Sequence, residues 1–189
     1  MIAPPCRRRT IAKLAHCKLN VPKHSEARAG MADVEGQLLR IGRVGPVLDV
    51  ALAHPPVNAL DQHICAALSD ALDLATVTEC GVVLIRGEAG VFSAGQDLGS
   101  ARAAEAAALR DLCGRIEELA CPVVVLLQGP VLGGAAQLAL AAHLRLADET
   151  VQFALPEVAF GLVPGAGGTQ RLPRLVGAAA ALDLSLIHI

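Results

Sequence analysis

Aromatic side chains are scarce in this sequence, which has no tryptophan, no tyrosine and three phenylalanines among its 189 residues. Hydrophobic residues nevertheless make up 53% of the chain, so alanine, leucine and valine must fill most of its core. A chain of this length can bury a sizeable core as a single domain.

Positive charge is scarce beyond the first thirty residues. All three lysines lie before residue 31, and the remaining 159 residues hold nine arginines and seventeen acids. The body of the chain is therefore mildly acidic and has no basic stripe. Because a nucleic-acid-binding surface needs clustered positive charge, we do not expect nucleic acid as a partner.

Motifs for metals, disulfides and nucleotides are also missing. The six cysteines form no C-x-x-C pair, and the six histidines show no metal-ligand spacing. We therefore expect reduced thiols, as in a cytosolic compartment, and no metal site. His63 and His143 are interpreted as structural. No P-loop or G-x-S-x-G is present, and the GAGGTQ of residues 165–170 lacks the third glycine and the long buried strand of a dinucleotide-binding loop.

The two ends of the chain differ from its body. Residues 1–30 hold seven basic residues and one acid, with no apolar stretch typical of a secretion signal. They fit an organelle transit peptide, a disordered arm, or an extension before a true start at Met31; we favour the last, because composition changes abruptly there. The expected domain is residues 31–189, incomplete at its C-terminus, and the expected location is cytoplasmic, or an organelle matrix if residues 1–30 are a transit peptide.

One uncharged run, residues 119–144, is long enough to span a bilayer. Pro122, the Gln-Gly-Pro of residues 128–130, the glycine pair at 133–134 and Gln137 interrupt it. These breaks favour two buried elements in a globular core over one membrane helix. No membrane partner is therefore expected.

Short apolar runs alternate with helix-forming segments along the chain, which predicts an α/β fold with repeated β-β-α turns. Strands are expected over residues 37–41, 46–53, 81–86, 122–127, 144–147 and 151–154. Helices are expected over residues 62–75 and 98–120 and after the glycine pair at 133–134. Asp61 is expected to cap the first helix, and Thr169 a final helix pair broken at Pro173.

The glycine pair Gly133-Gly134 stands between a buried strand, residues 122–127, and a run of strong helix formers. The first N–H groups of a helix that begins here have no partner within the helix and lie at the positive end of its dipole. Because glycine has no Cβ, a ligand oxygen can come close to these amides. The pattern predicts a site for an oxygen that becomes negative during a reaction.

Four motifs in order, HPPVNAL, FSAGQDL, VLGGAAQLALA and LPEVAFGLVPGAGGTQRLPRLVG, resemble the crotonase superfamily of enoyl-CoA hydratases and isomerases. The resemblance covers roughly residues 37–184 and looks strongest to the hydratase/isomerase part of multifunctional β-oxidation enzymes. It implies a spiral of β-β-α units, usually a homotrimer, that binds acyl-CoA thioesters without a further cofactor. The family's last helices would follow this chain, so an apolar face at Leu175, Ala178 and Leu182 is expected to be uncovered.

The resemblance assigns the backbone amides of Gln96 and Gly134 to an oxyanion hole for the thioester oxygen. It assigns the remaining substrate contacts to residues of the same four motifs: Pro56, Val57, Ala94, Asp97, Leu98, Gly133 and Pro156. Asp97 is also a candidate helix cap.

The family's two acids map to Glu157 and to Gln137, and the third glycine of the glycine run is here Ala135. Burial can raise the pKa of Glu157 so that it serves as an acid or base, although a solvated turn glutamate fits its sequence context equally well. Gln137 can hydrogen-bond a water but cannot accept its proton. Hydration is therefore expected to be slow and single-base isomerisation favoured, with a non-catalytic acyl-CoA-binding module as the alternative.

Overall fold

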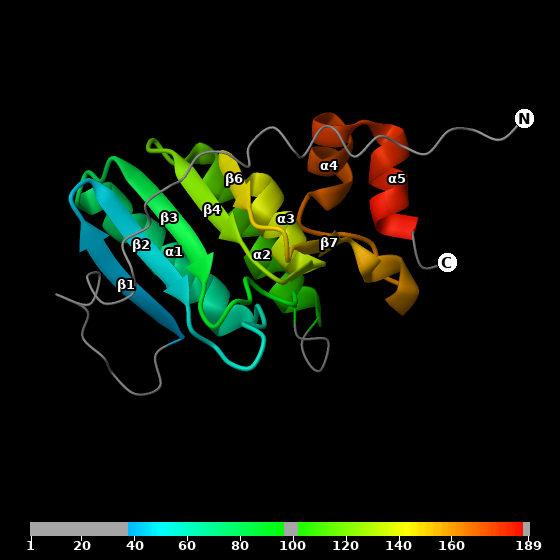
Figure 1. Ribbon diagram of the computed structural model, residues 1–189, viewed down its shortest axis with the longest axis horizontal. Helices are drawn as coiled ribbons and strands as arrows, with labels where there is room; N and C mark the ends of the chain where they lie inside the picture. Colours follow the sequence, from blue (N-terminus) through cyan, green and yellow to red (C-terminus); the bar gives the residue numbers. More distant parts are fainter. Residues whose placement is uncertain (1–37, 97–101, 187–189) are drawn as a thin grey trace, which may run out of the picture.

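The computed structural model describes residues 38–96 and 102–186. The larger of its two sheets has five strands in the order β1-β2-β3-β4-β6 (Figure 1). β1 is antiparallel to β2, and the other neighbours are parallel. The strands are β1 (Leu39–Val44), β2 (Val47–Leu52), β3 (Val82–Gly87), β4 (Val123–Leu127) and β6 (Leu144–Ala147). A second, two-stranded parallel sheet joins β5 (Pro130–Leu132) to β7 (Gln152–Ala154).

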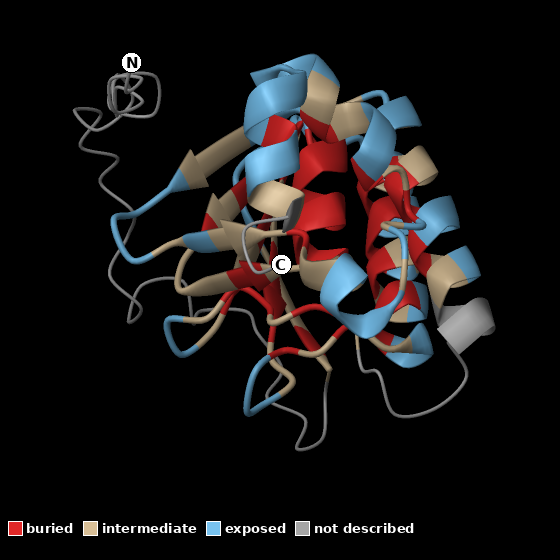
Figure 2. Cartoon of the chain, turned by 90° about the vertical axis from the view of Figure 1, so that its right-hand side faces the viewer, coloured by how far each residue is buried: buried red, intermediate tan, exposed pale blue. Residues whose placement is uncertain are grey.

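Three helices, α1 (Gln62–Val77), α2 (Arg102–Glu118) and α3 (Gly134–Ala141), cover one face of the large sheet (Figure 1). Alternate residues of the central strands point into this layer and are fully buried, such as Val50, Ile85 and Val125. Figure 2 shows the buried segments as a continuous interior, bounded by exposed helix faces and loops. Aliphatic side chains and alanines dominate this core, as the scarcity of aromatics predicts, with Phe92 its one large aromatic among the described residues.

The carboxyl ends of β3 and β4 lie side by side, because the two strands are parallel neighbours with Val83 opposite Val123. The chain that leaves β3 therefore meets the chain that leaves β4 at one edge of the sheet. β7 adds the segment that leads into a short 3₁₀ helix, η1 (Pro156–Phe160). Three loops far apart in the sequence converge at this edge.

Most of the predicted elements are confirmed, with boundaries shifted by a few residues. Asp61 caps α1, because its Oδ1 accepts a hydrogen bond of 2.7 Å from the N–H of Ile64. The predicted connection after residue 41 was too long, since β1 continues to Val44 and turns tightly at Gly45, whose φ is +57°. β5 was not predicted, because it is only three residues long and begins at the proline of the Gln-Gly-Pro break, so it carries no periodic signal.

The end of the described chain corrects one prediction. α4 (Gly168–Val176) begins after Gly167, not at a Thr169 cap, and Pro173 lies inside it. The break before α5 (Ala178–Leu186) falls at Gly177, whose φ of +84° lies in a region that favours glycine. The predicted uncovered face is confirmed, since Leu175 and Leu182 are 52% and 57% exposed.

The uncharged run of residues 119–144 is divided among β4, β5 and α3, so the single-helix alternative is wrong. Within residues 38–96 and 102–186, no helix has the length and apolarity that a bilayer span requires. His143 accepts a hydrogen bond of 3.0 Å from the N–H of Val123, which confirms its structural role. His63 is an exposed residue of α1 beside Asp61.

Candidate active site

The loop after β3 is joined to β5 by backbone hydrogen bonds. The N–H of Ser93 donates to the carbonyl of Pro130 at 3.2 Å, and the N–H of Leu132 donates to the carbonyl of Ser93 at 3.4 Å. The Ser93 hydroxyl in turn accepts from the N–H of Gly95 at 3.1 Å. The buried serine thereby fixes the backbone immediately before Gln96.

Glycines allow this loop to lie directly against the start of α3. Gly95 has a φ of +100°, and a Cβ there would stand 2.4 Å from the carbonyl oxygen of Leu132. A Cβ on Gly134 would stand 2.6 Å from Cγ of Gln96. The structure therefore brings Gln96 and Gly134 together, as predicted. Because Gly134 is the first residue of α3, its N–H has no acceptor within that helix.

Glu157, in the first turn of η1, lies beside this glycine pair. Its Oε1 would be 3.5 Å from a Cβ on Gly133, and the same oxygen accepts a hydrogen bond of 2.8 Å from Nε2 of Gln137. Its Oε2 is shielded from solvent and has no hydrogen-bond partner in the part of the chain that the structure describes. Burial raises the pKa of Glu157, while its own backbone N–H and the Gln137 amide lower it. The solvated-turn alternative is therefore wrong.

Gln137 is a residue of α3 that lies next to Glu157, and it is only 1% exposed. Its Oε1 accepts hydrogen bonds from two backbone N–H groups, those of Ala166 at 2.7 Å and Gly168 at 3.2 Å. Because only the oxygen can accept, these donors fix the amide so that its NH₂ group faces Glu157. The oxygen of Gln137 therefore already accepts two hydrogen bonds from the protein backbone.

The HPPVNAL loop packs against the same region through Asn58, which sequence reasoning missed. Its Oδ1 accepts from the N–H of His54 at 2.9 Å, and its Nδ2 donates to the carbonyls of Val91 and Phe92 at 2.8 and 3.2 Å. The signal in the sequence was an asparagine in a proline-rich loop, since Asn58 adopts a φ of +52°, which asparagine tolerates better than most residues.

The remaining predicted contacts lie on the HPPVNAL loop, on the loop after β3 and at the start of η1. The N–H of Ala94 donates to the carbonyl of Val57 at 3.0 Å, which places exposed Pro56 and Val57 beside the loop after β3. Pro156 is next to Glu157 as the first residue of η1. Asp97 and Leu98 lie outside the described residues, so their predicted substrate contacts and the Asp97 cap stay predictions.

A cavity of about 290 Å³ lies between α4, α5 and the segment before η1. Its wall is mainly apolar and includes Leu155, Gly168, Leu172 and Leu182, but not Glu157 or Gln137. Across the described ranges, no group of three or more histidine, cysteine, aspartate or glutamate side chains could hold a metal ion.

The sequence profile of the enoyl-CoA hydratase/isomerase family matches residues 43–187. The chain belongs to this family. The predicted resemblance and the α/β crotonase fold are thereby confirmed, and an enoyl-CoA hydratase from Bacillus anthracis has the same fold, with a TM-score of 0.75 and 30% identity over 79% of this chain and 62% of that one.

Curated relatives of this hydratase/isomerase family member include both short and long proteins. A probable enoyl-CoA hydratase of Bacillus subtilis is 41% identical over 71% of this chain and 56% of its own length. A human peroxisomal bifunctional enzyme is 41% identical over 71% of this chain and 19% of its own. The chain therefore spans about half of the first relative and about a fifth of the second.

Proposed function

We propose that this protein binds an acyl-CoA thioester and that Glu157 moves a proton at the carbon next to the thioester carbonyl. The single observation that carries the proposal is the carboxylate of Glu157: its Oε1 and Cδ lie beside the Gly133-Gly134 turn, and its Oε2 is buried with no hydrogen-bond partner among the described residues. A carboxylate with a raised pKa and one free oxygen is suited to take and return a proton.

The negative charge that develops on the thioester oxygen needs donors close by. The N–H groups of Gln96 and Gly134 come from two loops that the glycines allow into contact, and we propose that they hold this oxygen as it becomes an enolate. The start of α3 adds the positive end of a helix dipole. Removing one such donor typically lowers the rate by about 10²–10³.

Isomerisation is the reaction that fits one base. Glu157 would take a proton from C2 of a 3-enoyl-CoA, giving a dienolate whose charge rests on the thioester oxygen. The protonated Glu157 would then return that proton at C4, which leaves the double bond between C2 and C3. No water and no second acid takes part.

Hydration needs a second group that takes a proton from water. The side chain that hydrogen-bonds Glu157 is an amide, and its oxygen is occupied by the N–H groups of Ala166 and Gly168. A missing acid or base typically costs about 10²–10⁴ in rate. We therefore place isomerase activity ahead of hydratase activity.

The substrate supplies coenzyme A itself, so the proposal includes no separate cofactor. Pro56, Val57 and Ala94 would line the path of the CoA arm, and Gly133 and Pro156 would flank the thioester. A homotrimer is the proposed assembly. The cytoplasmic location, or an organelle matrix as its alternative, stays a prediction.

A non-catalytic acyl-CoA-binding module is the second candidate, favoured by the hydrogen bond that engages one oxygen of Glu157. The Glu157→Gln variant separates the two functions, because the amide keeps the shape of the site and removes the base. For an enzyme, turnover of a 3-enoyl-CoA should fall by about 10²–10⁴ while affinity is retained. If wild type and variant bind acyl-CoA equally and neither turns it over, the binding module is correct.

A further inference from the structure

An ion pair between two helices lies behind the candidate active site. Nε and Nη2 of Arg171, in α4, donate to the two carboxylate oxygens of Glu117, in α2, at 2.7 and 2.6 Å. The Arg171 side chain is only 15% exposed, so this two-pronged pair is better shielded than a typical surface pair.

The third nitrogen of this guanidinium holds the loop before α4. Nη1 of Arg171 donates to the carbonyl of Ala166, and a Cβ on Gly167 would stand 2.2 Å from that nitrogen. The guanidinium therefore packs directly against the backbone of residues 166–168, and only glycine fits at the middle position.

The opposite side of the same loop faces Gln137. The N–H groups of Ala166 and Gly168 both donate to Oε1 of Gln137, whose Nε2 donates to Glu157. A continuous chain of contacts thus leads from Glu117 through Arg171, residues 166–168 and Gln137 to the carboxylate. We propose that Arg171, held by Glu117, is a positioning residue that keeps the Gln137 amide turned toward Glu157; its relevance to catalysis rests on the proposed function of Glu157.

The causes of the pKa shift of Glu157 are consistent with an indirect effect of Arg171 on this carboxylate. Its pKa responds to burial, to its own backbone N–H and to the Gln137 amide, and the charge of Arg171 is not among the causes. Any effect of Arg171 on Glu157 therefore passes through the loop and the orientation of Gln137. Because the Gln137 hydrogen bond lowers the pKa of Glu157, its loss leaves burial as the dominant cause and raises that pKa further.

The test compares Arg171→Met with Arg171→Lys and with a matched control, Arg115→Met. Arg115 also extends from α2 to an acid, Asp73 of α1, but this pair is more exposed and does not touch residues 166–168. The readout is the titration of Glu157 in the full chain by ¹³C NMR, with its signal assigned by its absence in Glu157→Gln. Turnover is not needed for this measurement.

We expect the midpoint of the Glu157 titration to rise in Arg171→Met, to return partly in Arg171→Lys, and to match wild type in Arg115→Met. An unchanged or lowered midpoint in a folded Arg171→Met would overturn the proposal. Should Arg171→Met fail to fold, the milder Glu117→Gln decides, since it keeps one acceptor for Arg171 and should raise the midpoint by a smaller amount. If Glu157→Gln leaves turnover unchanged, the proposed function fails whatever this titration shows.

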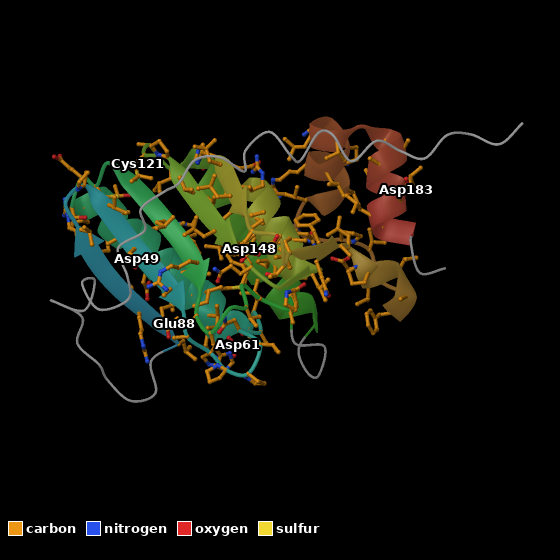
Figure 3. The ribbon with its side chains drawn as sticks, viewed as in Figure 1. Asp49, Asp61, Glu88, Cys121, Asp148 and Asp183 are labelled. Atoms are coloured by element: carbon orange, nitrogen blue, oxygen red, sulfur yellow. The ribbon has the colours of Figure 1, made fainter. Side chains whose placement is uncertain are left out.

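A second, independent inference concerns two thiols at the opposite edge of the sheet. Cys80 precedes β3 and Cys121 precedes β4, and their Sγ atoms are 3.6 Å apart although both are free thiols. Figure 3 shows Cys121 at the other end of the sheet from Asp61 and Glu88, which flank the edge that carries the candidate active site. Because β3 and β4 are paired, the fold itself keeps the two sulfur atoms together.

We infer that Cys80 and Cys121 are a disulfide-forming pair whose oxidant is a small disulfide such as oxidised glutathione. The half-buried Cys121 thiolate attacks oxidised glutathione and releases one glutathione thiolate. The Cys80 thiolate then attacks the mixed disulfide and releases the second. The protein loses two electrons and two protons, and the oxidant becomes two glutathiones. Burial and the Cys80 thiol raise the pKa of Cys121, so the reaction should quicken as pH rises.

The test incubates the full chain with oxidised glutathione and maps peptides without reduction. We expect a peptide pair that joins Cys80 to Cys121, a mass lower by two hydrogens, and a melting temperature higher by several degrees because the bond constrains the unfolded chain. Cys113→Ser is the matched control. Burial raises the pKa of the Cys113 thiol to about 12, so this thiol takes no part in the exchange, and the variant should still form the Cys80–Cys121 bond. Stable glutathionylation of Cys121 without the bond, or no oxidation at all, would refute the inference.

Discussion

Nε2 of Gln137 donates a hydrogen bond of 2.8 Å to Oε1 of Glu157, so an amide and a carboxylate share the place where the family resemblance puts two acids. The amide cannot turn around, because the N–H groups of Ala166 and Gly168 hold its oxygen. Among the described residues, this leaves Oε2 of Glu157 as the oxygen of the pair without a hydrogen-bond partner.

Replacing Gln137 with glutamate should add hydratase activity. The new carboxylate would accept from the two backbone N–H groups and would share a proton with Glu157, which supplies the missing second acid or base. We expect crotonyl-CoA hydration to rise by at least about tenfold, toward the 10²–10⁴ that such a group contributes. A Gln137→Glu protein that binds acyl-CoA and shows no gain in hydration would count against this assignment.

Stability should depend on pH through Glu157. Burial raises its pKa in the folded protein, so the folded state holds this proton more tightly than the unfolded chain does. The contribution of Glu157 to the free energy of unfolding is fully present below the pKa that this residue has in the unfolded chain. It is lost as pH rises through the pKa that Glu157 has in the folded protein. We expect Glu157→Gln to melt higher than wild type at neutral pH, with a smaller difference at pH 4. If the difference in melting temperature between Glu157→Gln and wild type is the same at both pH values, Glu157 is solvated.

Gly134→Ala should disable the oxyanion hole. The added Cβ would stand 2.6 Å from Cγ of Gln96 and 2.9 Å from Cδ2 of Leu109, so these side chains must shift and disturb the place where Gln96 meets the start of α3. We expect kcat to fall by about 10²–10³, as for the loss of one donor. The control is Gly114→Ala in α2, where a Cβ meets nothing within 4 Å and where alanine should stabilise the helix by about 1 kcal/mol. Equal activity in the two variants would contradict the assignment.

Asn58→Ala should destabilise the loops around the site. The substitution leaves the N–H of His54 and the carbonyls of Val91 and Phe92 without their partner. The expected loss in the free energy of unfolding is roughly 1–3 kcal/mol, measured by urea titration. Asn58→Asp at neutral pH should be destabilised as well, because it places a buried carboxylate oxygen against the two carbonyl oxygens. A stability equal to wild type for Asn58→Ala would mean that water replaces these contacts.

The sequence predicted the parts of the site that depend on local chemistry. Gly133 and Gly134 are recognisable because a strand, a break and a run of helix formers surround them, whereas Glu157 was assigned by the family resemblance, since its local context fits a solvated turn equally well. Contacts between distant segments left no such pattern. Nothing near Gln137 indicates that the backbone of residues 166–168 would fix its amide, and nothing near Arg171 indicates its pairing with Glu117.

Helix ends were predicted well where a side chain makes the cap and poorly where the backbone does. Asp61 caps α1 with its carboxylate, which is a sequence signal. α4 is flanked by Gly167 and Gly177, whose positive φ angles place the helix ends without a side-chain hydrogen bond. Thr169 and Pro173 carried the stronger apparent signals, yet both lie inside the helix.

The central claim is that Glu157 removes a proton next to a thioester carbonyl. It is tested most directly with a 3-enoyl-CoA that carries deuterium at C2, by following deuterium at C4 of the product by NMR, because Glu157 is proposed to carry that proton from C2 to C4. We expect wild type to transfer deuterium to C4, and Glu157→Gln to form the product at least about 10²-fold more slowly with unchanged affinity. Conversion at equal rates by the two proteins, or binding without conversion in wild type, would contradict the account.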